Sequence, residues 1–409
     1  MSSPRRILHA DADAFFVAVA RAADPDGAGR APLLIVGGRP GGRGVVCSAS
    51  YETRAFGVRS AMPISQALRL CPDALCVPVP RAACGTTSKA ISAVLDRFTP
   101  LVERASIDEW YLDLTGTEAL HAHETLEETA ARIRQTVHRE TGMWLSIGGG
   151  SSKLIAKLAA ERAKPRQKTD ATGVKVVPAG DEGAFMCTLA LAEIPGIGPK
   201  LQAKLASVGL MRVEDVLPHD RATLARWLGR RPAEWLWARV RGIHTTPVEP
   251  RGANRQISRE STFARDLSDD VQLVAHLRAL ATKAASELRA ERLAARTVTV
   301  KLRDADFTTR LASRTLPEPL ESDRAIGDVA ATLLSRLRRA RRFPSRLVGV
   351  ALGGLGPARD AEQLGLFAPA AGTIERVEDR ALARAVDKVR ERFGDAAIRA
   401  ASTPMRRAP

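Results

Sequence analysis

Short apolar runs alternate with amphipathic stretches in the first part of the chain, and this alternation predicts a mixed sheet-and-helix domain. Runs rich in β-branched and other apolar residues predict strands over 7–11, 33–38, 44–50, 101–107, 109–114 and 144–148. Apolar positions at helical spacing predict helices over 14–23, 65–70, 85–98, 124–140 and 152–163. Strands mixed with helices in this way are typical of an α+β fold.

The pattern changes twice further along the chain. Residues 189–245 are helical throughout, and the polar stretch 248–260, with Pro and Gly, indicates a linker. The elements expected after it are a strand over 255–264, a helix over 268–292, strands over 296–304 and 307–316, a helix over 321–341 and a strand over 345–354. This β-α-β-β-α-β order predicts a ferredoxin-like unit, and one more helix is expected over 374–393.

Length and charge narrow the class of protein. A chain of 409 residues is expected to form two to four domains. Its formal net charge of +16 favours a polyanionic partner, most simply nucleic acid. No apolar run is long enough to span a membrane and the first ten residues lack the apolar core of a signal peptide, so we expect no membrane partner and a cytoplasmic location.

The five cysteines form no C-x-x-C pair and have no histidine at metal-ligand spacing. We therefore expect buried thiols in a reducing compartment and neither a disulfide framework nor a zinc site.

Two acids stand at the end of the first predicted strand, in HADADAFF (9–16). Hard divalent cations such as Mg²⁺ prefer carboxylate oxygens, so Asp11 is a candidate metal ligand. The alternative is that an acid here caps the following helix. The cap explains Asp13 better than a metal role does, and for Asp11 the two interpretations are equally good.

The segment SIDEWYLDL (106–114) carries two adjacent acids, Asp108 and Glu109. Neighbours on a regular strand point to opposite faces, but at a bend between two antiparallel strands both side chains can converge. The alternative is a solvated hairpin tip, where Asp is common. Together with Asp11, these acids form a three-carboxylate set that suits two Mg²⁺ ions about 3.5–4 Å apart and an in-line phosphoryl displacement.

Basic residues in two further segments are candidate phosphate contacts. Arg54, in SASYETRAFGVRSAMP (48–63), suits a phosphate clamp, although a lone arginine is more often a surface charge. Lys153, Lys157 and Lys164 cover much of one side of the helix predicted over 152–163 and the residues after it. Phosphate contact and a solvated basic face explain these lysines equally well.

PGIGPKLQAKL (195–205) has the signature of a helix-hairpin-helix motif. Backbone amides in a tight turn at Gly196 and Gly198 can meet a DNA phosphate, and Lys200 and Lys204 add positive charge. The alternative is an ordinary turn between helices.

EQLGLF (362–367) places Leu and Phe in a region with little predicted structure. It is either a docking peptide or a loop that packs on its own domain, and physical reasoning does not separate the two.

HADADAFF, SYETRAFGVRSAMP, SIDEWYLDL, the AKP of residues 163–165 and PGIGPK occur in one order along the chain. Together they resemble Y-family DNA polymerases of the DNA polymerase IV class, which are bacterial translesion enzymes, over roughly residues 6–355. The resemblance implies a multidomain right hand with a ferredoxin-like palm, small fingers, a helical thumb and a β-α-β-β-α-β little finger. The domain limits that we expect are 1–30 and 77–170 for the palm, 31–76 for the fingers, 171–245 for the thumb with its helix-hairpin-helix, 246–257 for a linker, 258–356 for the little finger and 357–409 for a tail.

The resemblance also implies roles for residues. Asp11, Asp108 and Glu109, with the Ala12 carbonyl, would hold two Mg²⁺ ions, for which Mn²⁺ is an alternative. Phe16 matches the aromatic steric gate that clashes with a ribose 2′-OH. The residues implied to bind the incoming nucleotide are Phe15, Phe16, Ser48, Tyr51, Arg54 and Lys164, and those of a peptide that docks on the bacterial sliding clamp are Gln363, Leu364, Leu366 and Phe367, within 363–367.

The implied function is template-directed DNA synthesis of low fidelity past lesions in DNA repair, by a monomer whose partners are primer-template DNA, dNTPs and the sliding clamp. The rival interpretations are a non-catalytic clamp-docking scaffold, which is expected to lack palm acids, and a helix-hairpin-helix nuclease. Several features depart from the usual family pattern, among them Trp110, which stands where a small residue is common, and GGGSSK (148–153), which replaces a stretch with Asn before Lys.

Overall fold

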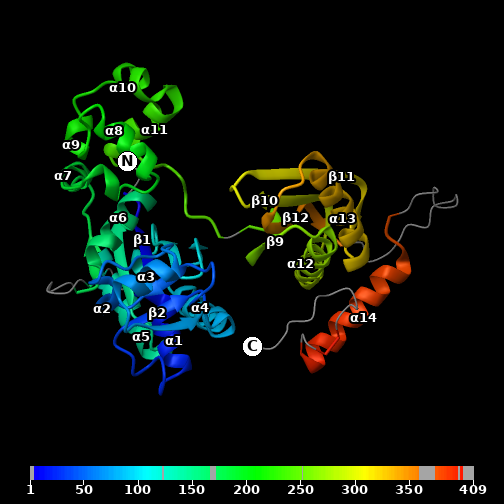
Figure 1. The fold of residues 1–409 in the computed structure, drawn as a ribbon. Coiled ribbons are helices and arrows are strands. Elements are labelled where there is room, and N and C mark those ends of the chain that lie inside the picture. Colours follow the sequence, from blue (N-terminus) through cyan, green and yellow to red (C-terminus); the bar gives the residue numbers. More distant parts are fainter. Residues whose placement is uncertain are drawn as a thin grey trace. The chain divides into compact units, whose positions relative to one another are not determined.

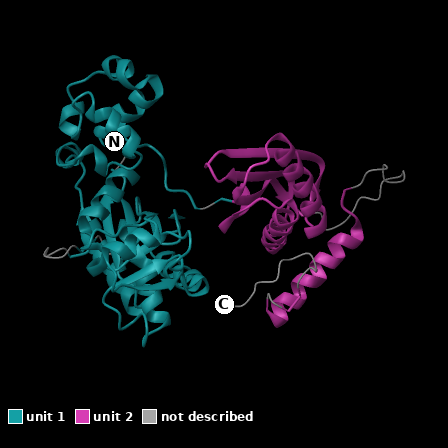
Figure 2. Ribbon diagram, viewed as in Figure 1, with its two compact units in different colours: residues 1–252 teal, residues 253–409 magenta. Residues whose placement is uncertain are grey.

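The computed structural model describes residues 4–121, 124–165, 172–250, 252–358, 374–394 and 397–398. The chain divides into two compact units, residues 1–252 and residues 253–409 (Figure 2). Within the described residues, strands assemble into three sheets, two in the first unit and one in the second (Figure 1). The mixture of sheets and helices confirms the predicted α+β class.

The largest sheet has five strands in the order β5-β6-β1-β7-β8. The strands are β5 (Val102–Arg104), β6 (Glu109–Asp113), β1 (Ile7–Ala12), β7 (Leu145–Gly150) and β8 (Val174–Val176). All neighbours are antiparallel except β7 and β8. β8 was not expected from the sequence because it is only three residues long and lies at the edge of the sheet.

Helices pack against this sheet on both faces. They are α1 (Phe15–Ala23), α4 (Arg81–Leu95), α5 (Leu126–Thr141) and α6 (Lys153–Ala163), and a 3₁₀ turn, η1 (Glu118–His121), precedes α5. Leu8 and Ala10 of β1 join a core with residues of α4 and α5, whereas Ile7, on the other face, meets Ala156 of α6. The alternating faces of β1 therefore separate the main core from the side that α6 covers.

Two glycines in β7, Gly148 and Gly150, let α6 lie unusually close to the sheet. A Cβ atom added at Gly148 would stand 2.1 Å from the backbone oxygen of Ala156 and 2.1 Å from the backbone nitrogen of Ala160. A Cβ at Gly150 would stand 2.4 Å from the Ile155 side chain. The GGGSSK departure thus has a packing reason, since side chains here would push α6 off the sheet.

A smaller sheet of order β3-β2-β4 follows α1 in the chain. Its elements are β2 (Leu34–Gly37), β3 (Val46–Ala49), α2 (Tyr51–Arg54), α3 (Ile64–Leu70) and β4 (Leu75–Pro78). β4 pairs in parallel with β2 and was not expected, because its side chains are largely exposed and give no strong apolar run.

The predicted all-helical region is confirmed. Its elements are α7 (Glu182–Cys187), the 3₁₀ turn η2 (Leu191–Glu193), α8 (Pro199–Ala206), α9 (Val213–Val216), α10 (Arg221–Leu228) and α11 (Arg230–Val240). They share one core with α6 residues such as Leu154 and Leu158.

The second unit confirms the predicted β-α-β-β-α-β order. The elements are β9 (Gln256–Leu267), α12 (Asp270–Ala290), β10 (Leu293–Asp304), β11 (Thr309–Leu320), α13 (Asp323–Ala340) and β12 (Ser345–Pro357). The sheet order is β11-β10-β12-β9, with antiparallel neighbours, and both helices pack against its apolar face.

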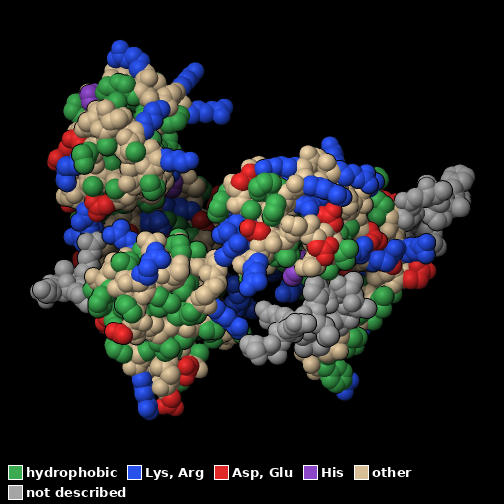
Figure 3. Space-filling view, viewed as in Figure 1, with side chains coloured by type: hydrophobic (Ala, Val, Ile, Leu, Met, Phe, Trp, Pro, Cys, Tyr) green, Lys and Arg blue, Asp and Glu red, His purple; other side chains and the backbone are tan. Residues whose placement is uncertain are grey.

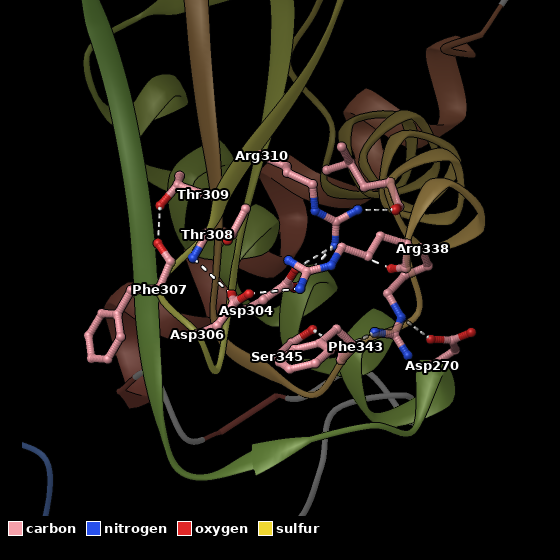
Figure 4. Close-up of polar contacts among 12 residues, drawn as sticks. Asp270, Asp304, Asp306, Phe307, Thr308, Thr309, Arg310, Arg338, Phe343 and Ser345 are labelled. Atoms are coloured by element: carbon pink, nitrogen blue, oxygen red, sulfur yellow. Dashed lines mark hydrogen bonds and ion pairs between the residues drawn. The ribbon is translucent and has the colours of Figure 1, made fainter.

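One end of this sheet is fixed by arginine–carboxylate contacts (Figure 4). Asp304 is completely buried and is bound by Arg310 and Arg341, at 3.0 and 3.1 Å. Phe307 lies at the tip of the β10–β11 hairpin with a positive φ of 66° and a ring that is 62% exposed. The buried charge is therefore fully paired, as burial requires.

The predicted last helix is α14 (Val377–Phe393), and it docks on the second unit. Asp387 binds Arg289 of α12 at 2.6 Å, and Asp379 binds Arg324 of α13. Just before α14, the Glu375 carboxylate accepts hydrogen bonds from the backbone of Glu321 and Ser322. The tail thus returns to the sheet domain of this unit after residue 373.

Candidate active site

Asp11 and Glu109 lie opposite each other on neighbouring antiparallel strands, β1 and β6. Their side chains are on the face that α6 covers, because Lys157 of α6 binds Glu109 at 2.6 Å and Lys164, the C-cap of α6, binds Asp11 at 3.0 Å. The sequence predicted that these two acids lie on separate strands, but not which residues of the two strands are paired. The observed pairing places the two acids side by side.

Asp108 lies in the tight turn between β5 and β6, as the bend interpretation predicted. The backbone amides of Ala105 and Ser106 both donate to the Glu109 carbonyl, at 3.0 and 3.2 Å, which closes the turn. Ala12 N–H donates to the Asp108 carbonyl at 2.9 Å, and the Ser106 hydroxyl donates to the Asp108 carboxylate. The backbone of Asp108 is therefore fixed beside the end of β1.

The lysines of α6 and its C-cap do not form a solvated basic face, because each binds a carboxylate within the protein. Lys153 is 9% exposed and binds both carboxylate oxygens of Glu103 at 2.6 Å, with its ammonium 4.6 Å from the Tyr111 ring centroid. With the Lys157 and Lys164 contacts, each lysine holds a carboxylate of the sheet. Both expectations for this set overlooked these internal ion pairs.

His9 is completely buried next to the acids. Its Nε2 lies 3.9 Å from the Glu109 carboxylate, a contact longer than a hydrogen bond, and burial lowers the pKa of His9. The neighbouring His9 and Lys157 side chains hold the pKa of Glu109 well below its usual range. Glu109 is therefore ionised at neutral pH, while His9 is uncharged.

Asp11 is only 8% exposed, and its environment opposes its charge. Burial raises the pKa of Asp11 from 3.8 to about 7, against the opposite effect of Lys164. Although burial disfavours the Lys164 ammonium, the carboxylates of Asp11 and Glu161 raise the pKa of that lysine. Asp11 therefore needs more positive charge nearby to be fully ionised.

Asp13 does not cap α1, and that expectation was wrong. The N-cap residue is Ala14, with φ 45° and ψ 43°, and no side chain caps the helix. Asp13 instead accepts a hydrogen bond from the Ser146 hydroxyl of β7 at 2.6 Å, while its other carboxylate oxygen is buried without a partner. Burial raises the pKa of Asp13.

Trp110 is fully buried on the core side of β6, away from the paired acids. Its indole N–H donates to the Ser92 hydroxyl of α4 at 2.9 Å. The bulk of Trp110 therefore fills the space between the sheet and α4 and does not enter the side that holds Asp11 and Glu109.

Two of the three residues implied to bind the triphosphate, Tyr51 and Arg54, lie on α2, and the third, Lys164, is the C-cap of α6. Arg54 donates to the Ala49 carbonyl at 3.0 Å, reaches the Ser48 hydroxyl at 3.5 Å and lies 4.9 Å from the Tyr51 ring centroid. Burial raises the pKa of Tyr51, and the charge of Asp13 raises it further.

The adjacent phenylalanines have different surroundings. Phe15 is 2% exposed in the core, so only its backbone is available to a ligand. Phe16 is half-buried, with its ring 5.5 Å from that of Phe15 in an edge-to-face arrangement. Of the two side chains, only Phe16 can meet a nucleotide without disruption of the core.

The predicted helix-hairpin-helix turn lies between η2 and α8. Gly196 has φ 101°, and a Cβ there would stand 2.7 Å from the Trp235 ring, so glycine is required. Gly198 is the N-cap of α8, and Lys200 and Lys204 are exposed on that helix. The turn thus presents a helix N-terminus flanked by two lysines.

The acids fit a hard divalent cation by chemistry. Asp11 and Glu109 offer carboxylate oxygens from paired strand positions, the Ala12 hydrogen bond holds Asp108 beside them, and Asp11 lacks sufficient positive charge. Over the described ranges, however, no group of three His, Cys, Asp or Glu side chains is placed to hold one ion. Lys157 and Lys164 bind the Glu109 and Asp11 carboxylates here.

Sequence reasoning selected Lys153, Lys157 and Lys164 but missed that they pair with acids of the sheet. The i, i+4 spacing of Lys153 and Lys157 was visible, but their pairing with Glu103 and Glu109 depends on how α6 crosses the sheet. The peptide Gln363–Phe367 lies outside the described residues. Among the helices that the structure describes, none is long and apolar enough to cross a membrane.

Comparisons with known proteins agree with this geometry. The sequence model of the impB/mucB/samB family matches residues 10–161, and that of the impB/mucB/samB family C-terminal domain matches residues 254–366. The chain is 35% identical over 402 residues to "DNA polymerase IV" of Dehalococcoides mccartyi (strain CBDB1), covering 98% of both proteins.

Two further relatives extend the comparison. "DNA polymerase IV" of Halorhodospira halophila (strain DSM 244 / SL1) is 38% identical over 360 residues, which cover 88% of this chain and 98% of that protein. The solved structure of a Y-family DNA polymerase chimera of Dbh and Dpo4 superposes with a TM-score of 0.75 at 25% identity, over 85% of this chain and 98% of the other.

Proposed function

Because the chain belongs to the Y family of DNA polymerases and is a DNA-directed DNA polymerase, we propose that it adds dNTPs to a primer 3′-OH at the site formed by Asp11, Asp108 and Glu109. The observation that supports this site best is the pairing of Asp11 with Glu109 across β1 and β6, with Asp108 fixed in the adjoining turn. Translesion synthesis is the activity of the family.

We assign the parts of the hand by the limits expected from the sequence. Four strands of the five-stranded sheet, with its helices, serve as the palm (1–30 and 77–170), and the smaller sheet as the fingers (31–76). The fifth strand, β8, lies within the range expected for the thumb. Residues 171–245 serve as the thumb, 246–257 as the linker and 258–356 as the little finger. β9 begins at Gln256, so the last two residues of that linker are already in a strand.

The acids suit two Mg²⁺ ions, with the Ala12 carbonyl as a further oxygen ligand. When bound, such ions make the primer 3′-OH more acidic and neutralise the triphosphate and the leaving pyrophosphate. Asp11 gains most from them, since its present environment leaves its charge poorly compensated. Mn²⁺ fits the same oxygen donors.

The protein's own residues orient the substrates. Tyr51 and Arg54, whose side chains lie together on α2, and Lys164 position the triphosphate of the dNTP, while the Phe16 ring excludes a ribose 2′-OH. The Gly196–Gly198 turn and the exposed Lys200 and Lys204 hold the DNA backbone. We assign clamp docking to residues 363–367 in the tail.

A primer-extension assay with Mg²⁺ tests the proposal. Asp108→Ala is expected to abolish both primer extension and pyrophosphate release, whereas Asp26→Ala, an exposed acid outside the site, keeps both. Undiminished synthesis by Asp108→Ala would show that the site is elsewhere. Release of cleaved DNA in place of pyrophosphate would favour the nuclease interpretation.

The same primer-extension assay distinguishes a catalytic protein from the non-catalytic scaffold. A non-catalytic protein would show no extension in any variant and would act only by bringing another polymerase to a sliding clamp. Extension on lesion-bearing templates with the clamp present, and less extension without it, is the expected result for a catalytic protein with a clamp-docking peptide.

A further inference from the structure

The connection between β1 and α1 contains a backbone conformation that costs energy. Ala14 has φ 45°, in the left-handed region, and it begins α1 with no capping side chain. For a residue with a Cβ atom this conformation costs on the order of 1–2 kcal/mol. Such conformations persist only where neighbouring groups hold them, and they concentrate at functional sites.

Strand β7 holds the preceding residue, Asp13, at two points. Asp13 N–H donates to the Trp144 carbonyl at 3.0 Å, and the completely buried Ser146 hydroxyl donates to Asp13 Oδ1 at 2.6 Å. These two contacts flank Leu145, the partner of Ala12 in the strand pairing. Asp13 is therefore fixed to β7 immediately before the strained residue.

The β7 side of this attachment is itself rigid. The Trp144 ring stacks on His138 of α5, with centroids 3.6 Å apart and planes 9° apart. The Arg134 guanidinium lies 4.1 Å from the centroid of the Trp144 ring and donates to the Leu145 carbonyl. His138 and Arg134 of α5 thus fix the start of β7, to which Asp13 is bound.

This attachment controls where the next two side chains point. Phe15 is locked in the core, and Phe16 follows it at the first turn of α1, half-buried. The carbonyl of Ala14 accepts the first hydrogen bonds of the helix, from Val17 and Ala18 at 2.8 and 3.0 Å. Relaxation of Ala14 would therefore rotate the start of α1 and move the Phe16 ring.

We propose that Asp13 and Ser146 are positioning residues that fix the Phe16 ring and thereby set the discrimination between deoxyribonucleotides and ribonucleotides. The proposal rests on the gate role given to Phe16 under the proposed function. A displacement near 1 Å of a group that meets substrate can change rates by up to about 100-fold, so a small release is enough to matter.

The test measures kcat/KM for a dNTP and for the matching ribonucleotide, in full-length variants. Ser146→Ala and Asp13→Ala are each expected to lower the dNTP:rNTP ratio about tenfold, equivalent to about 1.4 kcal/mol, through a higher ribonucleotide kcat/KM. Asp13→Asn keeps an oxygen that accepts from Ser146 and is expected to stay within about twofold of the unmodified ratio.

The Phe16→Ala variant distinguishes a failure of this inference from a failure of the proposed function. If Phe16→Ala relaxes sugar selection while Ser146→Ala and Asp13→Ala keep the original ratio, the positioning role is wrong. If Phe16→Ala itself leaves the ratio unchanged, the gate assignment is wrong. A merely structural role is excluded by rescue in Asp13→Asn, and should Ser146→Ala not fold, Asp13→Ala against Asp13→Asn decides the question.

Discussion

At the scale of single residues, two acids of the candidate site are each paired with a lysine. Lys157 holds Glu109 and Lys164 holds Asp11, both within hydrogen-bond distance. Acids in apolar strands are conspicuous in a sequence, so Asp11, Asp108 and Glu109 could be selected as candidates. The lysines were also selected, but their pairing with these acids could not be predicted, because those contacts depend on the position of α6.

Asp11→Asn tests the cost of the buried carboxylate in the metal-free protein. Burial raises the pKa of Asp11 to about 7, so the stability that protonated Asp11 contributes is present in acid and is lost as pH rises through about 7. We expect Asp11→Asn to stabilise the protein by about 2 kcal/mol more near pH 8 than near pH 5. Denaturant unfolding at both pH values measures this difference.

The control for that experiment is Asp26→Ala, which removes an exposed acid. Its effect on the free energy of unfolding should be small and the same at both pH values. An equal effect of Asp11→Asn at both pH values would contradict the raised pKa.

At the scale of elements, β7 and α6 form the most constrained contact of the candidate palm. The helix lies so close that a methyl group at Gly148 would overlap its backbone. Helix and strand positions followed from the apolar pattern, as for α5, α12 and α13. The short strands β4 and β8 did not, because three or four partly exposed residues carry too little pattern.

Gly148→Ala is expected to destabilise the first unit by at least about 3 kcal/mol, since β7 and α6 must separate. Gly85→Ala is the matched control: Gly85 lies inside α4, and a Cβ there meets nothing within 4 Å. That control should stabilise the protein by up to about 1 kcal/mol. Thermal unfolding of both variants measures this difference in stability, and similar melting temperatures would contradict the close contact between β7 and α6.

At the scale of the whole molecule, the most pronounced property is the excess of positive charge. Lys and Arg side chains are visible on both units in Figure 3, and the formal net charge is +16. That excess could be predicted from composition alone. Which cations face DNA could not, because many arginines, such as Arg289, are bound to carboxylates within the protein.

DNA affinity is expected to fall steeply with salt concentration, because bound cations release counterions from DNA. Replacing both Lys200 and Lys204 by Ala should reduce the slope of log K against log salt by about 2. Lys175→Ala, an exposed residue of β8, should leave the slope unchanged. An unaltered slope in the double variant would contradict a DNA contact by the helix-hairpin-helix.

α14 packs on the rest of the second unit as a bound peptide would, although it belongs to the same chain. If a protease site is introduced between Ala358 and Ile374, the cleaved helix should stay bound at low salt, through Asp387–Arg289 and Asp379–Arg324. Asp387→Ala should release it, and gel filtration after cleavage would show this. Residues 359–373, which contain the QLGLF sequence, therefore join two segments that both contact this unit, so a partner that binds that sequence would meet an internal segment of the chain.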